Sequence, residues 1–313
     1  MPAERRVGMD HEHYDWSPIP SRGVLQWPHE ARVALCVVVS LEHMEWQPPA
    51  GSYESPLLGG GLGARPFPDY ARLSHREYGH RVGIFRVLDV LEKHGIVPTV
   101  ALDALTAEHY PYLVRHCLQR QCEIMGHGLS VSQMITSHLS QAEEQAYIHS
   151  AIETLTQATG RAPTGWLSPE YGESSRTPQL LAQAGIQYVC DWTNDEQPYR
   201  LHTAQGELYA LPILLELDDL HAMGQRRVPV DRYGTLLTES FATLYRDGAS
   251  NGRLLVLSLH PWYVGQPFRI GFLDAALETI MRRQGVWAAN GAAIIDWYRR
   301  HAPSASGAPI ATR

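Results

Sequence analysis

Three places along the chain put a carboxylate or an imidazole directly after a run of apolar residues. They are Glu42 with His43, His127, and His260. A carboxylate can take a proton from water, and an imidazolium can give a proton to a departing nitrogen. If the three places meet in one cleft, these side chains suit hydrolysis, with a carboxylate as the general base and an imidazolium as the general acid.

Each of these side chains also has a purely structural explanation. Glu42 and His43 could form a polar turn at the end of a strand, and His127 could be a hydrogen-bonded structural histidine. His260 is the more specific signal, because a run of Leu and Val that ends in His-Pro places the ring at a fixed exit. Other apolar runs are followed by further acids, namely Glu170, Asp191, Asp195, Asp218 and Asp219.

The elements that must position these groups alternate between apolar runs and amphipathic stretches. The runs predict about seven strands, at 33–39, 98–102, 122–125, 163–170, 186–190, 208–217 and 254–259, and a last short strand beginning at Val286. Helices are predicted at 78–94, 106–121, 140–159, 177–184, 236–246, 272–283 and 292–301, and Ser140 with Glu143 forms a capping box. Such alternation indicates an α/β fold, a distorted (β/α) barrel whose strand ends meet at one face.

Segments at both ends are expected to lie outside this barrel domain, which runs from 32 to 301. Residues 1–31 are rich in Pro, His and Trp and predict an irregular arm, and residues 302–313 predict a flexible tail. A stretch at 47–70 contains too much Gly and Pro for regular structure. It suits a lid, a subunit interface or an unordered insertion, and the sequence does not choose among them.

Composition and charge exclude several classes of function. The chain has 313 residues, of which 44% are hydrophobic and 19% are charged, as in ordinary globular proteins. Its net charge of −7 is spread without basic blocks, which argues against a nucleic-acid partner. No stretch resembles a membrane span or a secretion signal, so we expect no membrane partner, a cytoplasmic location and a small-molecule substrate.

Four motifs follow one another in an order that resembles a known family. They are SLEH at 40–43, EIMGHG at 123–128, GWLSPEYGESSRTPQLLAQAGIQYVCDWTNDEQPY at 165–199 and LSLHPWYVGQPFR at 257–269. As a set they are similar to the polysaccharide deacetylase superfamily, carbohydrate esterase family 4. The chain looks closer to its cytoplasmic branch of metal-independent allantoinases and cyclic imide hydrolases than to secreted chitin or peptidoglycan deacetylases. The resemblance spans about 32–300 and implies a deacetylase-like barrel.

Carried over position by position, the resemblance implies roles for the first residues named. Glu42 inherits the place of the base, and His260 that of the general acid. His43 takes the place of a metal-binding acid. His127 is kept from a pair of histidines whose second member is Val131 here, so one metal ligand is missing and His127 becomes a substrate-binding or metal-binding group.

The resemblance also implies residues around the substrate. Ser168 lies in the segment 167–169, which lacks the Arg that orients the base in deacetylases, and it is expected to donate a hydrogen bond to the substrate. Asp195 and Tyr199 resemble a loop that surrounds the substrate, and Trp166 would wall an apolar pocket. The structural alternatives are an Asx turn at Asp195 and core packing for Trp166.

The altered motifs imply either no cofactor or a single divalent metal such as zinc at His43 and His127. A zinc site needs at least three protein ligands, and Glu42 could complete such a set only with an unfamiliar geometry. Without a metal, the carbonyl must be more reactive than an acetamide. We therefore expect a hydrolase acting on the C–N bond of a small cyclic amide, imide or ureide, and the resemblance implies that it is a homo-oligomer. The alternatives are a metal-dependent N-deacetylase of an amino sugar or oligosaccharide, and a catalytically inactive binding module.

Overall fold

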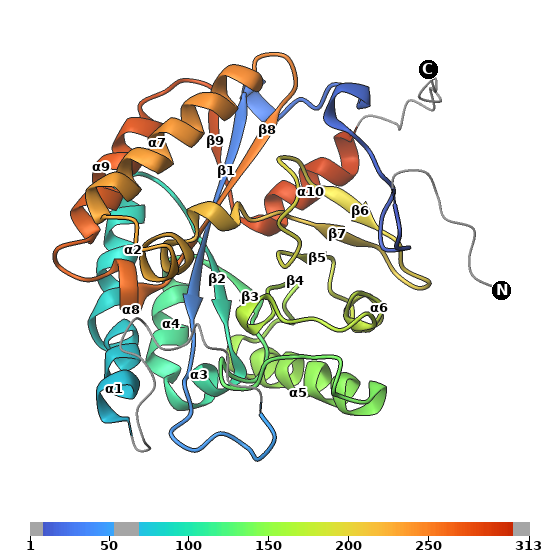
Figure 1. The fold of residues 1–313 in the computed structure, drawn as a ribbon, viewed down its shortest axis with the longest axis vertical. Helices are drawn as coiled ribbons and strands as arrows, with labels where there is room; N and C mark the ends of the chain where they lie inside the picture. Colours follow the sequence, from blue (N-terminus) through green and yellow to red (C-terminus); the bar gives the residue numbers. More distant parts are fainter. Residues whose placement is uncertain (1–8, 53–68, 303–313) are drawn as a thin grey trace.

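A single curled sheet organises this computed structural model, which describes residues 9–52 and 69–302. Its strands run in the order β6-β7-β5-β4-β3-β2-β1-β8, and β9 is added on β1 (Figure 1). The strands are β1 Val33–Leu41, β2 Thr99–Leu102, β3 Glu123–Gly126, β4 Gly165–Trp166, β5 Tyr188–Val189, β6 Tyr199–Leu201, β7 Leu208–Ala210, β8 Arg253–Leu259 and β9 Val286–Ala288. Every pairing is parallel except that of β6 with β7. The sheet is therefore an open half-barrel of the (β/α) type.

Strand β1 is the centre of the sheet, and its composition explains why. All nine of its residues are buried, as expected for an apolar run in a parallel sheet. One edge pairs with β8 over most of its length, and the other edge is divided between β9 at the start and β2 at the end. Its side chains alternate between two clusters: Val33, Leu35, Val37 and Val39 pack in one, and Ala34, Cys36 and Val38 in the other.

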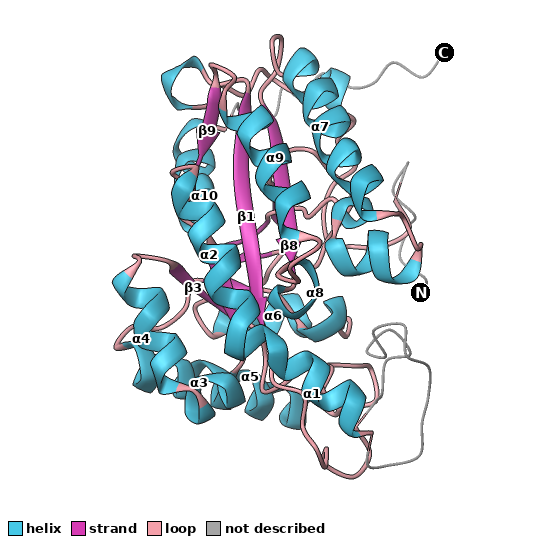
Figure 2. Ribbon diagram, turned by 90° about the vertical axis from the view of Figure 1, so that its left-hand side faces the viewer, coloured by secondary structure: helices cyan, strands magenta, loops and turns pink. Residues whose placement is uncertain are grey.

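Helices cover both faces of this strand. They are α1 Tyr70–Tyr78, α2 Ile84–Lys93, α3 Ala104–His109, α4 Pro111–Gln119, α5 Gln141–Thr159, α6 Thr177–Gln183, α7 Val230–Asp247, α8 Pro261–Val264, α9 Ile270–Met281 and α10 Gly291–His301. Figure 2 shows α2 and α9 in front of β1. On the other side, α10 closes the open half-barrel, because Ile294 and Ile295 pack with Ala34, Val38 and the arm residue Trp27 (Figure 1).

Most predicted elements are present, and the differences have local causes. The capping box of Ser140 and Glu143 begins α5 as predicted. The helix predicted at 106–121 is divided, because Pro111 starts α4. The helix predicted at 78–94 contains a π-helical turn, Gly79–Gly83, whose glycines pack against the backbone of α8, where a side chain would clash.

Two other predictions were wrong in extent. The strand predicted at 208–217 ends at Ala210, and Leu215–Leu217 forms a short 3-10 turn instead. The loop expected at 194–199 runs into strand β6 at its last residue, Tyr199, and the pairing of β6 with β7 explains why this part is extended. Residues 53–68 and 303–313 lie outside the described residues, and so do most of the predicted 47–70 loop and nearly all of the predicted tail. None of the described helices has the length and apolar character needed to cross a membrane.

Candidate active site

The carboxyl ends of the central strands border a cavity of about 300 Å³. Glu42 follows β1, His127 follows β3 and His260 follows β8, and all three line the cavity. Because these strands are parallel, their carboxyl ends lie at the same edge of the sheet. The structure thus brings together the base, the acid and one substrate-binding group that were predicted from separate stretches.

Glu42 is held from both sides by positive groups. Arg76, on α1, donates from Nη1 to Oε2 of Glu42 over 2.7 Å, and His127 Nε2 lies 3.2 Å from Oε1. The side chains of Glu42 and Arg76 are each only 3% exposed. Burial alone would raise the pKa of Glu42, but the charges of His260, His127 and Arg76 hold it well below its usual value. Glu42 is therefore an ionised carboxylate with a fixed orientation.

His260 is oriented by an acid that lies behind it. Its Nδ1–H donates to Asp219 over 2.6 Å, and its backbone N–H donates to the same carboxylate. This leaves Nε2 3.6 Å from Oε1 of Glu42. Burial lowers the pKa of His260, but the charges of Asp218, Asp219 and Glu42 outweigh it and raise the pKa to about 10. The ring is thus an imidazolium at neutral pH, with a proton on the nitrogen nearest Glu42.

His127 is protonated for a similar reason. Its Nδ1–H donates to the carbonyl of Leu167 over 2.6 Å, so Nε2 also needs a proton to bond Glu42. Burial works against this charge, but the hydrogen bond to Glu42 raises the pKa of His127 above its usual value. Two imidazolium groups and one carboxylate therefore converge on the cavity. This arrangement can activate water at Glu42 and protonate a leaving group from His260.

Ser168 and Trp166 lie on one side of the site, with Ser168 at the cavity and Trp166 behind it. Ser168 lines the cavity, and its backbone N–H donates to Asp191 over 2.8 Å. Trp166 is fully buried behind it, and its indole N–H donates to the Ser168 hydroxyl over 2.9 Å. Trp166 therefore packs in the core and orients Ser168, rather than walling the cavity as predicted.

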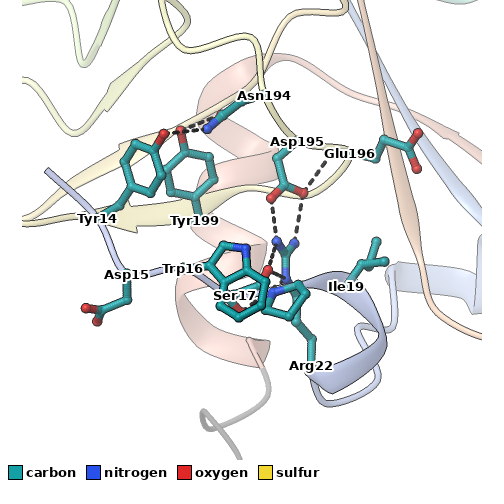
Figure 3. A pocket seen from close by; sticks show the side chains of 11 residues that line it. Tyr14, Asp15, Trp16, Ser17, Ile19, Arg22, Asn194, Asp195, Glu196 and Tyr199 are labelled. Atoms are coloured by element: carbon teal, nitrogen blue, oxygen red, sulfur yellow. Dashed lines mark hydrogen bonds and ion pairs between the residues drawn. The ribbon is translucent and has the colours of Figure 1, made fainter. Parts of the chain in front are cut away.

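Asp195 and Tyr199 belong to a different cavity, of about 430 Å³, between the N-terminal arm and the 194–199 loop (Figure 3). Arg22 of the arm donates to both oxygens of Asp195, over 2.8 and 2.5 Å. Asp195 also accepts from the backbone of the next two residues, which is the Asx turn considered above. The Asn194 side chain joins Tyr199 to Tyr14 of the arm. The structure does not place these residues beside Glu42.

The pair of histidines predicted to bind a metal does not form a ligand set. The ring of His43 stacks on His109, with ring centroids 5.1 Å apart, and does not line the cavity. Its backbone N–H donates to Asp103, which caps α3. Both ring nitrogens of His127 are bonded to protein groups, and the buried Val131 offers no ligand. The residues present therefore do not fit the metal site of the resemblance.

Among the described residues, one group of acids and histidines has its ligand atoms close together, namely Asp218, Asp219 and His260. Asp219 already accepts the two N–H bonds from His260 described above. Asp218 accepts from the Tyr171 hydroxyl over 3.1 Å and from the backbone N–H of His221 over 2.8 Å. The two carboxylates keep His260 protonated, and their oxygens already accept hydrogen bonds from protein groups. This group of residues therefore has no free set of ligand atoms for a metal ion either.

Arg76 was not predicted, although it orients Glu42. It lies 34 residues from Glu42 along the chain, near the end of a short helix with few apolar residues. Its guanidinium also stacks on Trp262, with Cζ 4.3 Å from the ring centroid. The signal available in the sequence was an Arg-rich helical stretch, 72–86, and spacing alone does not show which Arg turns inward.

Arg76→Gln is expected to destabilise the fold. Removing one partner of a buried ion pair leaves the other charge uncompensated, so the free energy of unfolding should fall by about 3 kcal/mol. Denaturant unfolding measures this change. Arg81→Gln, on the exposed side of the next turn, is the matched control and should change stability little. Equal stabilities for the two variants would contradict the central place of Arg76.

Comparison with known proteins gives the same family at three levels. Residues 77–189 match the family model for polysaccharide deacetylase. A Schizosaccharomyces pombe protein that carries the name polysaccharide deacetylase is 25% identical over 301 residues, which cover 88% of this chain and 93% of the relative. The alignment therefore extends well beyond the residues that the family model matches.

Two solved structures are similar over almost the same length. A protein of Pseudomonas aeruginosa PAO1, also named polysaccharide deacetylase, has a TM-score of 0.78 at 25% identity, and the match covers 88% of this chain and 93% of that one. PuuE allantoinase has a TM-score of 0.77 at 25% identity, with 88% and 92% covered. The half-barrel is thus shared with proteins that carry two different activity names.

Proposed function

Because the chain belongs to the polysaccharide deacetylase family, whose members are hydrolases, we propose that it opens a C–N bond in a small cyclic amide, imide or ureide. The family, the half-barrel and the hydrolase class agree with the predictions made from the motifs. The substrate is the part that we propose. It is supported above all by the arrangement of Glu42, whose two oxygens are held by Arg76 and His127 beside the His260 imidazolium.

The proposed reaction uses these groups in two steps. Glu42 takes a proton from water, and the water oxygen attacks the ring carbonyl carbon, whose oxygen gains negative charge near the His127 imidazolium. The C–N bond then breaks as His260 gives its Nε2 proton to the departing nitrogen. Proton exchange with solvent restores the ionised Glu42 and the charged His260. Asp219 stays ionised throughout. It orients the His260 ring and raises the pKa of His260.

The choice of a cyclic substrate follows from what polarises the carbonyl. The guanidinium of Arg76 and the imidazolium of His127 supply positive charge at Glu42, but this charge is more diffuse than that of a divalent metal, which acts as a Lewis acid. An imide-type carbonyl, whose nitrogen also carries a second acyl or carbamoyl group, needs less activation than the acetamide of an amino sugar. The likeness to PuuE allantoinase supports the same choice.

A metal-dependent N-deacetylase of an amino sugar is the second candidate, and the names of the deacetylase relatives favour it. Binding of a divalent ion would then require the side chains of Asp218, Asp219 or His43 to leave their present partners. The expected homo-oligomer, the cytoplasmic location and the domain limits stay predictions. Sedimentation of the purified protein tests the first of them.

Metal removal distinguishes the two candidate reactions. We expect purified protein to open hydantoin, dihydrouracil or succinimide at the same rate before and after treatment with a chelator, with metal below stoichiometry in elemental analysis. Activity on N-acetyl sugars that is lost to chelator and restored by zinc or cobalt would reverse the assignment. No turnover of either substrate class would favour a binding module.

A further inference from the structure

The lining of the catalytic cavity contains more carboxyl groups than cationic ones. Besides Glu42, it includes the carboxyl groups of Glu170, Asp191 and Asp218. The described lining contains three imidazoles. Of these, His127 is bonded to Glu42 and His260 to Asp219, while His221 lies next to Gln225 with Nδ1 2.9 Å from Oε1. A substrate with its own carboxylate or phosphate would therefore meet more carboxyl groups than imidazoles, and each imidazole is already bonded to a protein group at one or both ring nitrogens.

Glu170 is placed at this cavity by an unusual backbone conformation. Its φ of 53° and ψ of 28° are left-handed, and Tyr171 follows with φ 58°. Such angles are unfavourable for residues other than glycine and persist where surrounding contacts impose them. Here the backbone N–H groups of Tyr171 and Gly172 bond to the carbonyls of Ser168 and Pro169, each over 3.0 Å.

The Tyr171 side chain connects the same turn to Asp218. Its hydroxyl donates to Asp218, the acid that flanks His260, and lies 3.4 Å from the Ser258 hydroxyl. The turn that carries Glu170 is thus hydrogen-bonded to Asp218. Residues His29 and Glu30 have the same consecutive left-handed angles, also after a proline, but Glu30 is exposed and does not line the catalytic cavity. This second turn shows that the conformation is a local motif, and it provides a matched control.

We propose that Glu170 is a specificity residue that accepts hydrogen bonds from N–H groups on the non-reacting edge of the ring, so that the enzyme selects uncharged, N–H-rich rings and rejects rings that carry a carboxylate. The proposal rests on the proposed function and names the substrate class of that same site. A carboxylate suits this task, because it is an acceptor only and bonds N–H groups more strongly than a neutral amide does.

The test compares hydantoin with hydantoin-5-acetate, two rings that differ by one carboxylate. For the wild-type protein, kcat/KM should favour hydantoin by roughly a hundredfold, since like charges in a cavity cost several kcal/mol. Glu170→Gln should lower kcat/KM for hydantoin about tenfold, mainly by raising KM. The ratio of kcat/KM for hydantoin to that for hydantoin-5-acetate should therefore become smaller. Glu30→Gln should leave both values unchanged.

A second variant keeps the result interpretable. Glu170→Gly removes the carboxylate and suits the left-handed angles, so it should raise Tm while losing the same selectivity. A preference for hydantoin that is unchanged in both Glu170 variants would overturn the proposal.

A binding measurement shows whether the role of Glu170 or the proposed function is wrong. If the wild-type protein opens neither ring, the proposed function fails, and calorimetric binding of the two rings still tests Glu170. A binding preference for hydantoin that Glu170→Gln removes would support the assignment of Glu170 alone. Equal binding of the two rings would reject it.

Discussion

Glu42→Gln should lower kcat by about 10²–10⁴, the range expected when a general base is removed. Glutamine keeps the shape of the side chain, and its one carbonyl oxygen can still accept from Arg76, but it cannot take a proton from water. Most of the loss should therefore appear in kcat rather than in KM. Steady-state kinetics with hydantoin or succinimide measures it, and circular dichroism checks that the variant is folded.

Glu123→Gln is the matched control for this substitution. Glu123 is another buried carboxyl group of the same half-barrel, but it lies at the first residue of β3, at the opposite end from His127. It accepts from the Tyr188 and Thr99 hydroxyls. Burial raises the pKa of Glu123, and its carboxyl group does not line the catalytic cavity. Near-wild-type turnover in Glu42→Gln would remove Glu42 as the base, and an equal loss in both variants would point to general damage.

The positions of Glu42, His127 and His260 could be predicted because each depends on a local pattern. An apolar run that is long enough to cross a buried sheet ends at one face, and in a parallel sheet the ends of all such runs meet there. The same argument worked for α5, whose start is fixed by Ser140 and Glu143 alone. The sequence was sufficient to predict a residue's position wherever residues of the same segment fix the start or end of the strand or helix.

Contacts between distant segments could not be predicted in this way. Arg76 reaches Glu42 only because α1 packs against α8, where its guanidinium stacks on Trp262, and nothing within 72–86 distinguishes it from its neighbouring arginines. Asp195 was assigned to the substrate on its loop motif, but a bidentate bond from Arg22, 173 residues away, turns it toward the arm. Strand β6 is extended because β7 pairs with it. In each case the deciding partner lies in another part of the chain.

The role of His260 as the acid makes a prediction about pH. The imidazolium must be present to protonate the leaving nitrogen, and its pKa is raised to about 10. The kcat/KM should therefore stay high through neutral pH and fall as the pH rises through about 10. Its raised pKa also contributes stability that is fully present below the unfolded value of 6.5 and is lost as pH rises through about 10.

Asp219→Asn should move this alkaline limit downward by about 1–3 pH units, the usual effect of removing an opposite charge at contact distance. The limit should stay above that of an isolated histidine, because Asp218 and Glu42 still raise the pKa of His260. The introduced amide is also a weaker acceptor for the Nδ1–H of His260 than the carboxylate is, so kcat at neutral pH should fall as well. The pH dependence of kcat/KM for the two proteins measures both effects.

Asp231→Asn is the control for this pair of profiles. Asp231 lies at the exposed start of α7, so its loss should leave the alkaline limit in place. An alkaline limit that stays near 10 in Asp219→Asn would mean that a group other than His260 delivers the proton, because the substitution removes a charge that holds His260 in its acid form.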